Sequence, residues 1–175
     1  LQLLTGLCSY DTTEFMQLDA ATRRNLELTD TMRQGGVEAT LLGVLDCTVT
    51  PMGGRLLRRW LQQPLLDIAS INERLDGVSA AHCEGLLRAS LRTALRPLGD
   101  LERLTNRVAG GTATPRDLDA IRATLRGLPA LKESLAPEPL AAIAQEIDPA
   151  PEALELLRAA LPDDPPAKTE KSGFI

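Results

Sequence analysis

The side chains that could act in catalysis or bind a metal are few and far apart in this sequence. His82 is the single histidine, so a Ser–His or Cys–His relay has one possible base. Cys8, Cys47 and Cys83 form no C-x-x-C pair, which argues against both a zinc site and a disulfide framework. One histidine without a second ligand at helical spacing is expected to be packed or hydrogen bonded rather than to bind a metal.

Phosphate-binding and acid–base motifs are also missing from the sequence. No G-x-x-x-x-G-K-[ST] motif occurs, and the glycines in "QGGVEAT" and "GGTATPRD" are not followed by Lys-Ser/Thr. These glycines therefore predict turns and helix ends. Carboxylates are numerous, but no spacing marks a buried pair that could act as acid and base. The residues alone predict a helical scaffold, and no catalytic, cofactor-binding or metal-binding residue is assigned.

The charge is unevenly distributed along the chain, whose net charge is -5. Residues 88–132 hold nine basic and four acidic side chains, whereas residues 133–175 hold nine acidic and three basic ones. In one interpretation the two regions face each other or are simply solvated. In the other, the basic region is a nucleic-acid surface. The basic residues are Arg88, Arg92, Arg96, Arg103, Arg107, Arg116, Arg122, Arg126 and Lys132.

The composition is that of one helical domain. The chain has 175 residues, of which 43% are hydrophobic but 2% aromatic, so a surface that stacks bases on aromatic rings is excluded and the core must consist of aliphatic side chains. No apolar run approaches the length of a membrane span, and no signal peptide opens the chain. The scattered cysteines fit a reducing cytosol. The first residue is Leu1 and the last lies in a polar run, so a fragment of a longer chain is expected.

Helical periodicity extends over nearly the whole sequence and predicts an all-α fold. Thr50 is the expected N-cap of a helix in which Pro51 is the first residue and which ends at Gln63, before Pro64. Its apolar face is expected to be buried, with Trp60 as the core anchor. Asp46 and Asp67 are the acids expected to meet the arginines of the opposite face. The apolar face comprises Met52, Leu56, Leu57, Trp60 and Leu61, and the basic face Arg55, Arg58 and Arg59.

The next helices are marked by capping signals. "SINE" predicts a capping box with Ser70 as N-cap and Glu73 at the third position, opening a helix that buries Ile71, Leu75 and Val78 and continues with His82 on that face. Helices are expected from about 84 to 96 and from Asp100 to Gly110-Gly111.

"TPRD" at 114–117 predicts the longest helix. Thr114 caps it, Pro115 opens it and Asp117 adds negative charge to its first turn. Pro129 is expected to kink or break it. Its apolar stripe is Leu118, Ile121, Leu125, Leu128, Leu131 and Leu135. Shorter helices are predicted at about 140–147 and 152–160, a helical turn at 20–29 and one possible short strand at 14–19.

Five blocks in order and spacing resemble the core, or lever, domain of the MutS family of DNA mismatch-repair ATPases. They are "FMQLDAATRRNLEL", "LLGVLDCTVTPMGGRLLRRWLQQPLLD", "INERLDGV", "DLERLTNRVAGGTATPRDL" and "LPALKESL". The resemblance implies an irregular multi-helix core domain over 14–175, cut just before the clamp insertion, with the tail of the connector domain at 1–13. One departure is Ala39-Thr40, where the family often has Gly-Ser.

The resemblance also implies a function. The parent would be a cytoplasmic homodimer that binds mismatched duplex DNA through other domains, uses ATP and Mg²⁺, and recruits a MutL-type repair partner. This segment, which contains neither the phosphate loop nor the Phe-x-Glu mismatch motif of the family, would link those sites and transmit the ATP state. The residues expected to form the structural and coupling core are Asp46, Thr50, Met52, Arg55, Trp60, Asp100, Arg103, Thr114, Asp117, Leu118 and Leu125.

Two alternatives from other classes were weighed against this role. One is a stand-alone helical nucleic-acid-binding module that uses basic side chains of region 88–132, and the other is a small enzyme. The first would make several phosphate contacts, which predicts duplex affinity that falls steeply with salt. The second is disfavoured because the sequence shows no motif for a catalytic site. The sequence does not assign DNA-contacting residues in this segment.

Overall fold

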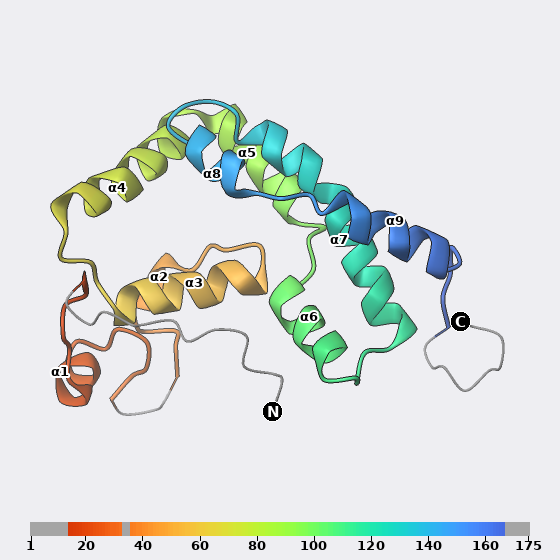
Figure 1. The fold of residues 1–175 in the computed structure, drawn as a ribbon. Helices are drawn as coiled ribbons and strands as arrows, with labels where there is room; N and C mark the ends of the chain where they lie inside the picture. The colour runs from red at the N-terminus through yellow and green to blue at the C-terminus, as the bar shows by residue number, and fades with distance from the viewer. Residues whose placement is uncertain (1–13, 33–35, 167–175) are drawn as a thin grey trace. The chain divides into compact units, whose positions relative to one another are not determined.

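The computed structural model describes residues 14–32 and 36–166, and the fold over these residues is all-α (Figure 1). The described residues divide into two compact units, one formed by residues 14–32, 36–47 and 55–75 and the other by residues 48–54 and 76–166. Helices α3 and α4 contribute residues to both units. The short strand expected at 14–19 is reduced, among the described residues, to a single bridge between Phe15 and Leu65. The connector tail expected at 1–13 lies outside the described residues.

The first unit begins with two short helices, α1 (Ala20–Asn25) and α2 (Leu41–Leu45). Asp19 caps α1 by accepting the backbone N–H of Thr22 at 2.6 Å. Thr40 caps α2 and is almost fully buried, since its hydroxyl donates to the carbonyl of Val37 and accepts from the N–H of Gly43. Thr40, at which the sequence departs from the family pattern, therefore caps α2 with its hydroxyl. Helix α2 itself was missed in the sequence because five residues are too few to show a period.

Helix α3 (Pro51–Gln62) begins as predicted, because the Thr50 hydroxyl accepts the N–H of Gly53 at 3.1 Å. The start predicted for helix α4 (Ile68–Cys83) is wrong. Asp67 is the cap, and its carboxylate accepts both the N–H and the hydroxyl of Ser70, at 2.8 and 2.7 Å. An aspartate three residues upstream offers a stronger, charged acceptor than the serine hydroxyl.

The burial predicted for α3 and α4 is also wrong in part. Trp60, the expected core anchor, is 36% exposed, and the guanidinium of Arg74 lies 4.1 Å from the centre of its ring. Leu75 and Val78 of α4 are 57% and 60% exposed, and His82 is exposed as well. An amphipathic period identifies which residues share a helix face, but it does not show that this chain supplies the surface that covers that face.

The second unit comprises helices α5 to α9, with α7 packed against the other four (Figure 1). Their bounds are α5 Gly85–Leu95, α6 Leu101–Ala109, α7 Pro115–Ser134, α8 Ala141–Glu146 and α9 Pro151–Ala160. The pair Gly110-Gly111 ends α6 as predicted, with Gly111 at a φ of +67°. The predicted break at Pro129 is wrong, because α7 is continuous through that residue.

The core of the second unit consists of the predicted α7 stripe and the residues facing it. Buried residues of α7 are Ile121, Leu125, Leu128 and Leu131, continued by Leu135, and they cluster with Leu98, Leu140 and Ala144. Leu118 is partly buried against this cluster. Because one helix supplies most of the core and touches all four neighbours, a change in α7 would be felt throughout the unit.

Candidate functional site

The start of α7 is fixed by a network of three side chains. The Thr114 hydroxyl accepts the N–H of Asp117 at 3.3 Å, while the Asp117 carboxylate accepts the N–H and the hydroxyl of Thr114, each at 2.7 Å. This is a reciprocal capping box, and the sequence predicted its cap and its charge. Arg107 of α6 adds a 2.8 Å ion pair to Asp117, so the two helices are joined at this corner.

Asp117 is ionised over a wider pH range than an ordinary aspartate. The hydrogen bonds from the Thr114 hydroxyl and backbone lower the pKa of Asp117 below 3.8, and the positive charges of Arg107 and Arg103 lower it further. Arg103 also belongs to the first turn of α6, where Asp100 accepts its N–H at 3.2 Å. Arg103, Thr114 and Asp117 are therefore linked at the junction of α6 and α7, while Asp100 caps the start of α6.

A second polar contact joins α7 to the segment that follows α5. The N–H of Gly99 donates to the hydroxyl of Thr124 at 2.9 Å, and this hydroxyl donates to the carbonyl of Ala120 at 2.7 Å. Thr124 is 1% exposed, so both bonds are shielded from water. It lies beside the predicted residue Leu125, but its role was missed because a threonine in a helix gives no sequence signal of a distant partner.

Arg122 is the least expected residue of the site. It is 6% exposed, although it belongs to the basic region 88–132, and it donates to Asp119 from Nε at 3.0 Å and from Nη2 at 2.7 Å. Its guanidinium also donates to the carbonyl oxygens of Leu161 and Pro162, each at 3.1 Å, and to that of Asp163 at 3.5 Å. The fork of guanidinium donors thus ties the middle of α7 to the chain that leaves α9. The spacing of Asp119 and Arg122 was the one available sequence signal.

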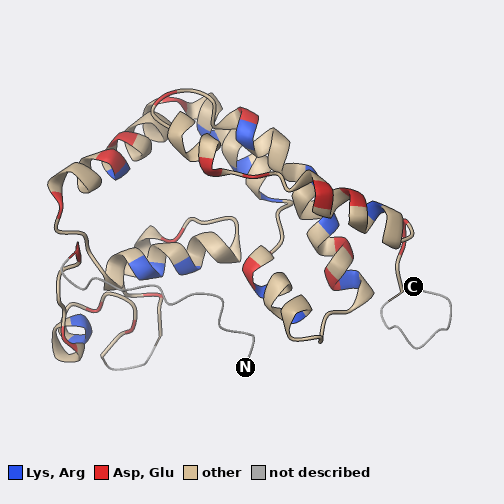
Figure 2. Ribbon diagram, in the orientation of Figure 1, with Lys and Arg blue, Asp and Glu red and all other residues tan. Residues whose placement is uncertain are grey.

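Other cations of the 88–132 region, which lies along α5, α6 and α7, also bind backbone carbonyls (Figure 2). Lys132 donates to the carbonyl of Ile147 at 2.9 Å, and Arg88 donates to the carbonyls of Ala81 and His82 at the end of α4, at 2.8 and 2.9 Å. Cations at helix ends offset the partial negative charge of the last carbonyls. Part of the basic region therefore stabilises the second unit, and the contacts of Arg122 and Lys132 with the segment 133–175 agree with the interpretation in which the two regions face each other.

The remaining predicted residues lie apart from the α6–α7 junction in the chain. Asp46 is the C-cap of α2, Thr50 and Met52 stand at the start of α3, and Arg55 and Trp60 lie further along α3. One acid that lies near an arginine of α3 is Asp30, 3.8 Å from Arg58. Asp67, which was expected in that role, accepts from Ser70.

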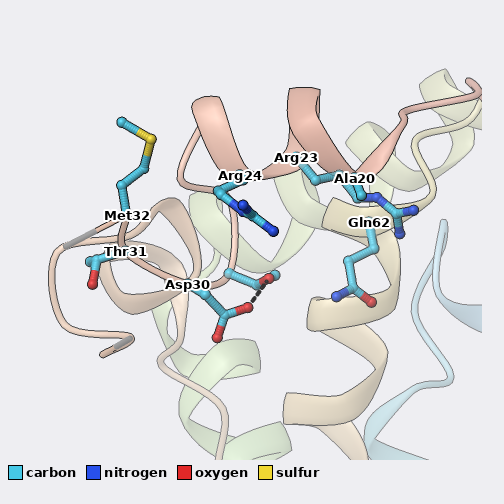
Figure 3. A pocket seen from close by; sticks show the side chains of 8 residues that line it. Ala20, Arg23, Arg24, Asp30, Thr31, Met32 and Gln62 are labelled. Carbon is cyan, nitrogen blue, oxygen red and sulfur yellow. Dashed lines mark hydrogen bonds between the residues drawn. The ribbon is translucent and has the colours of Figure 1, made fainter. Parts of the chain in front are cut away.

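The first unit contains a polar hollow of about 460 Å³ (Figure 3). It lies between α1, residues 29–32 and the last residue of α3. Figure 3 shows Arg24 extending toward Asp30 and Arg23 extending on the side of Gln62. Sequence reasoning missed this hollow, because its residues come from three segments without a shared motif. Its lining residues are Ala20, Arg23, Arg24, Thr29, Asp30, Thr31, Met32 and Gln62.

Metal and membrane features were sought over residues 14–32 and 36–166. No group of three or more His, Cys, Asp or Glu side chains in these ranges is placed to hold a metal ion. No helix formed by the same residues is long and apolar enough to cross a membrane. The most connected element of the second unit is α7, whose first turn, middle and last turns are each joined to a neighbouring segment.

Comparison with known proteins assigns the family. A family model described as MutS domain III matches residues 21–175. Proteins named DNA mismatch repair protein MutS are similar over nearly the whole chain: the one from Pelotomaculum thermopropionicum is 46% identical over 93% of this chain, that from Salinibacter ruber 46% over 95%, and that from Symbiobacterium thermophilum 42% over 98%. The chain spans about a fifth of the length of these relatives, 19% to 20%. The chain therefore belongs to the MutS family, with the match to domain III covering residues 21–175.

Proposed function

We propose that this chain is the structural core segment of a DNA mismatch-repair protein and that it transmits the ATP state of a distant site to the DNA-binding parts. The parent would bind mismatched duplex through other domains, use ATP and Mg²⁺ outside this segment, form a homodimer and engage a MutL-type partner in the cytoplasm. The relatives named DNA mismatch repair protein MutS support the repair role.

The observation that carries the coupling role is the way α7 is held. Its N-terminus is joined to α6 through Arg107 and Asp117, its middle to the chain after α9 through Arg122, and its last turns to Ile147 through Lys132. Coupling between distant sites requires packed elements with discrete arrangements rather than a flexible tether. A helix fixed at three levels to separate segments is packed rather than flexibly tethered, which supports the proposed role.

The test is Arg122→Met in the full-length parent, with Arg126→Met, an exposed arginine of the same helix, as the control. Affinity for a mismatched duplex is measured with and without ATP. We expect Arg122→Met to reduce the ATP-dependent change in DNA affinity about fivefold or more, because coupling free energies are commonly 1–3 kcal/mol. Equal ratios for both variants and the unmodified parent would contradict the proposal.

The stand-alone nucleic-acid-binding alternative loses support from the contacts of its own residues. Arg88 binds two carbonyls and Arg107 binds Asp117, so both guanidinium groups would have to exchange intramolecular partners for phosphates. A salt titration of duplex binding by the 175-residue chain distinguishes the two functions. The alternative predicts a steep loss of affinity between 50 and 200 mM salt, by roughly a thousandfold or more, for six or more phosphate contacts.

A further inference from the structure

The hollow of the first unit presents positive charge that the described chain leaves unpaired. Arg23 and Arg24 stand in the last turn of α1, and neither guanidinium has a hydrogen-bonding or ion-pair partner among the described residues. Arg23 lies near enough to Asp19 for its charge to help lower the pKa of that carboxyl, after the larger effect of the Thr22 hydrogen bonds. Two guanidinium groups at one hollow are suited to binding a carboxylate or a phosphate through paired N–H donors.

The same hollow also presents acceptors. Asp30 accepts the Thr29 hydroxyl at 2.8 Å and has Arg58 at 3.8 Å, and its side chain is 64% exposed. Gln62 adds a side-chain amide that can donate and accept hydrogen bonds, and no described residue forms a hydrogen bond with this amide. A ligand that fits must therefore bring a negative group for the arginines and N–H donors for Asp30 and Gln62.

We propose that this hollow binds an acidic polypeptide segment of the same parent chain, outside these 175 residues. A peptide that carries Asp or Glu supplies both requirements, a side-chain carboxylate for Arg23 and Arg24 and backbone N–H groups for Asp30 and Gln62. A nucleic-acid backbone supplies phosphate acceptors for the arginines but no N–H donors for Asp30 and Gln62.

The source of the segment follows from mass action. The matched relatives are much longer than the aligned stretch, which covers 19% to 20% of their length. A segment of the same polypeptide is present at a high effective concentration, so a modest, partly exposed site can be occupied without a tight bimolecular affinity. The inference rests on the family assignment and on these contacts, and it does not depend on the coupling role of α7.

The experiment places the photo-cross-linking residue p-benzoylphenylalanine at position 32 of the full-length parent, because Met32 lines the hollow and makes none of the proposed contacts, and maps the products by mass spectrometry. The expected product is a cross-link within one polypeptide to a segment rich in Asp or Glu. Replacing Arg23→Gln together with Arg24→Gln should lower its yield at least about tenfold, since hydrogen bonds to charged groups contribute about 1.5–3 kcal/mol each. Arg59→Gln, an exposed arginine of α3 that does not line the hollow, should leave the yield unchanged.

Three results would overturn the proposal. They are a cross-link to added mismatched duplex, a cross-link between isotopically labelled and unlabelled copies or to another protein, and a yield that the two arginine substitutions do not change. Circular dichroism of each variant shows whether it is folded, and Arg23→Lys with Arg24→Lys, which keeps the charge but loses the planar fork, should recover part of the yield. Recovery by lysine equal to that by arginine would exclude the paired guanidinium contact.

Discussion

Arg122 of α7 donates a hydrogen bond of 3.1 Å to the carbonyl oxygen of Leu161, 39 residues further along the chain. The donor is buried, and two further carbonyls lie within its reach. This contact ties the chain after α9 to the middle of α7, alongside the apolar packing of Leu154 and Leu157 of α9 against the core of the unit.

Replacing Arg122→Met should destabilise the 175-residue chain by about 2–3 kcal/mol, because the buried carbonyl of Leu161 would lose a charged donor. Denaturant titration measures the loss. Hydrogen exchange should also show faster exchange at residues 161–164 than elsewhere in the second unit. Arg126→Met removes an exposed side chain and should change stability by less than about 0.5 kcal/mol. Equal losses for the two variants would mean that the Arg122 contacts do not stabilise the fold.

Gly43 of α2 should not tolerate a side chain. A Cβ at this position would overlap the backbone carbonyl oxygen of Val37, which cannot move aside as a flexible side chain could. Gly43→Ala should therefore cost about 1–3 kcal/mol, the range for overpacking a tight site. Gly36→Ala is the matched control, since no atom lies within 4 Å of its new Cβ. Thermal denaturation of both variants checks the prediction, and a Gly43→Ala variant as stable as Gly36→Ala would show that the turn is looser than described.

The capping box of α7 should make stability depend on pH. The folded-state pKa of Asp117 is lowered below 3.8, chiefly by hydrogen bonds from Thr114. The unfolded chain therefore binds the proton first, and the stabilisation is present above the ordinary pKa and is lost as the pH falls through 3.8 toward the folded-state value. Asp117→Asn removes this contribution. Denaturant titrations from pH 7 to pH 3 should show a stability gap between the two proteins that narrows below about pH 4. A gap that is constant across this range would contradict the assignment.

The stacking of Arg74 on Trp60 is testable by a double-mutant cycle. Because Trp60 is 36% exposed, Trp60→Ala should cost less than the 3–5 kcal/mol typical of a buried tryptophan. The coupling between Trp60→Ala and Arg74→Ala should be about 0.5–1 kcal/mol, as for exposed cation–π pairs. Denaturation midpoints of the four proteins give this value. Strict additivity of the two changes would mean that the ring and the guanidinium do not interact in solution.

The sequence predicts the parts of this fold that local chemistry decides. The caps at Thr50 and Thr114, the helix start at Asp100 and the stop at Gly110-Gly111 depend on neighbours within a few residues, and all are confirmed. The α7 stripe is confirmed because six apolar positions in register outweigh one proline. The cap of α4 was misplaced because Ser70 and Asp67 both fit the pattern, and the carboxylate is the better acceptor.

Long-range polar contacts could not be predicted in the same way. Arginine is a residue type usually found at the surface. The burial of Arg122 depends on carbonyls about 40 residues away, which no periodicity encodes. The burial predicted for Trp60, Leu75 and Val78 was wrong for a related reason. Their helical phase identifies the apolar face, while what covers that face is not a local property.

The most direct measurement of the central claim concerns the apolar side of α7. In the full-length parent, Leu118→Ala and Leu125→Ala together remove packing from the helix while leaving its polar contacts in place. Leu86→Ala with Leu156→Ala is the control, because these side chains are 90% and 69% exposed. Affinity for mismatched duplex is measured with and without ATP under conditions where all proteins remain folded. If α7 transmits the ATP state, the ATP-dependent ratio of affinities should shrink about five- to hundredfold in the first variant alone, with nucleotide affinity nearly unchanged. A ratio equal to that of the unmodified parent would show that α7 is a passive support.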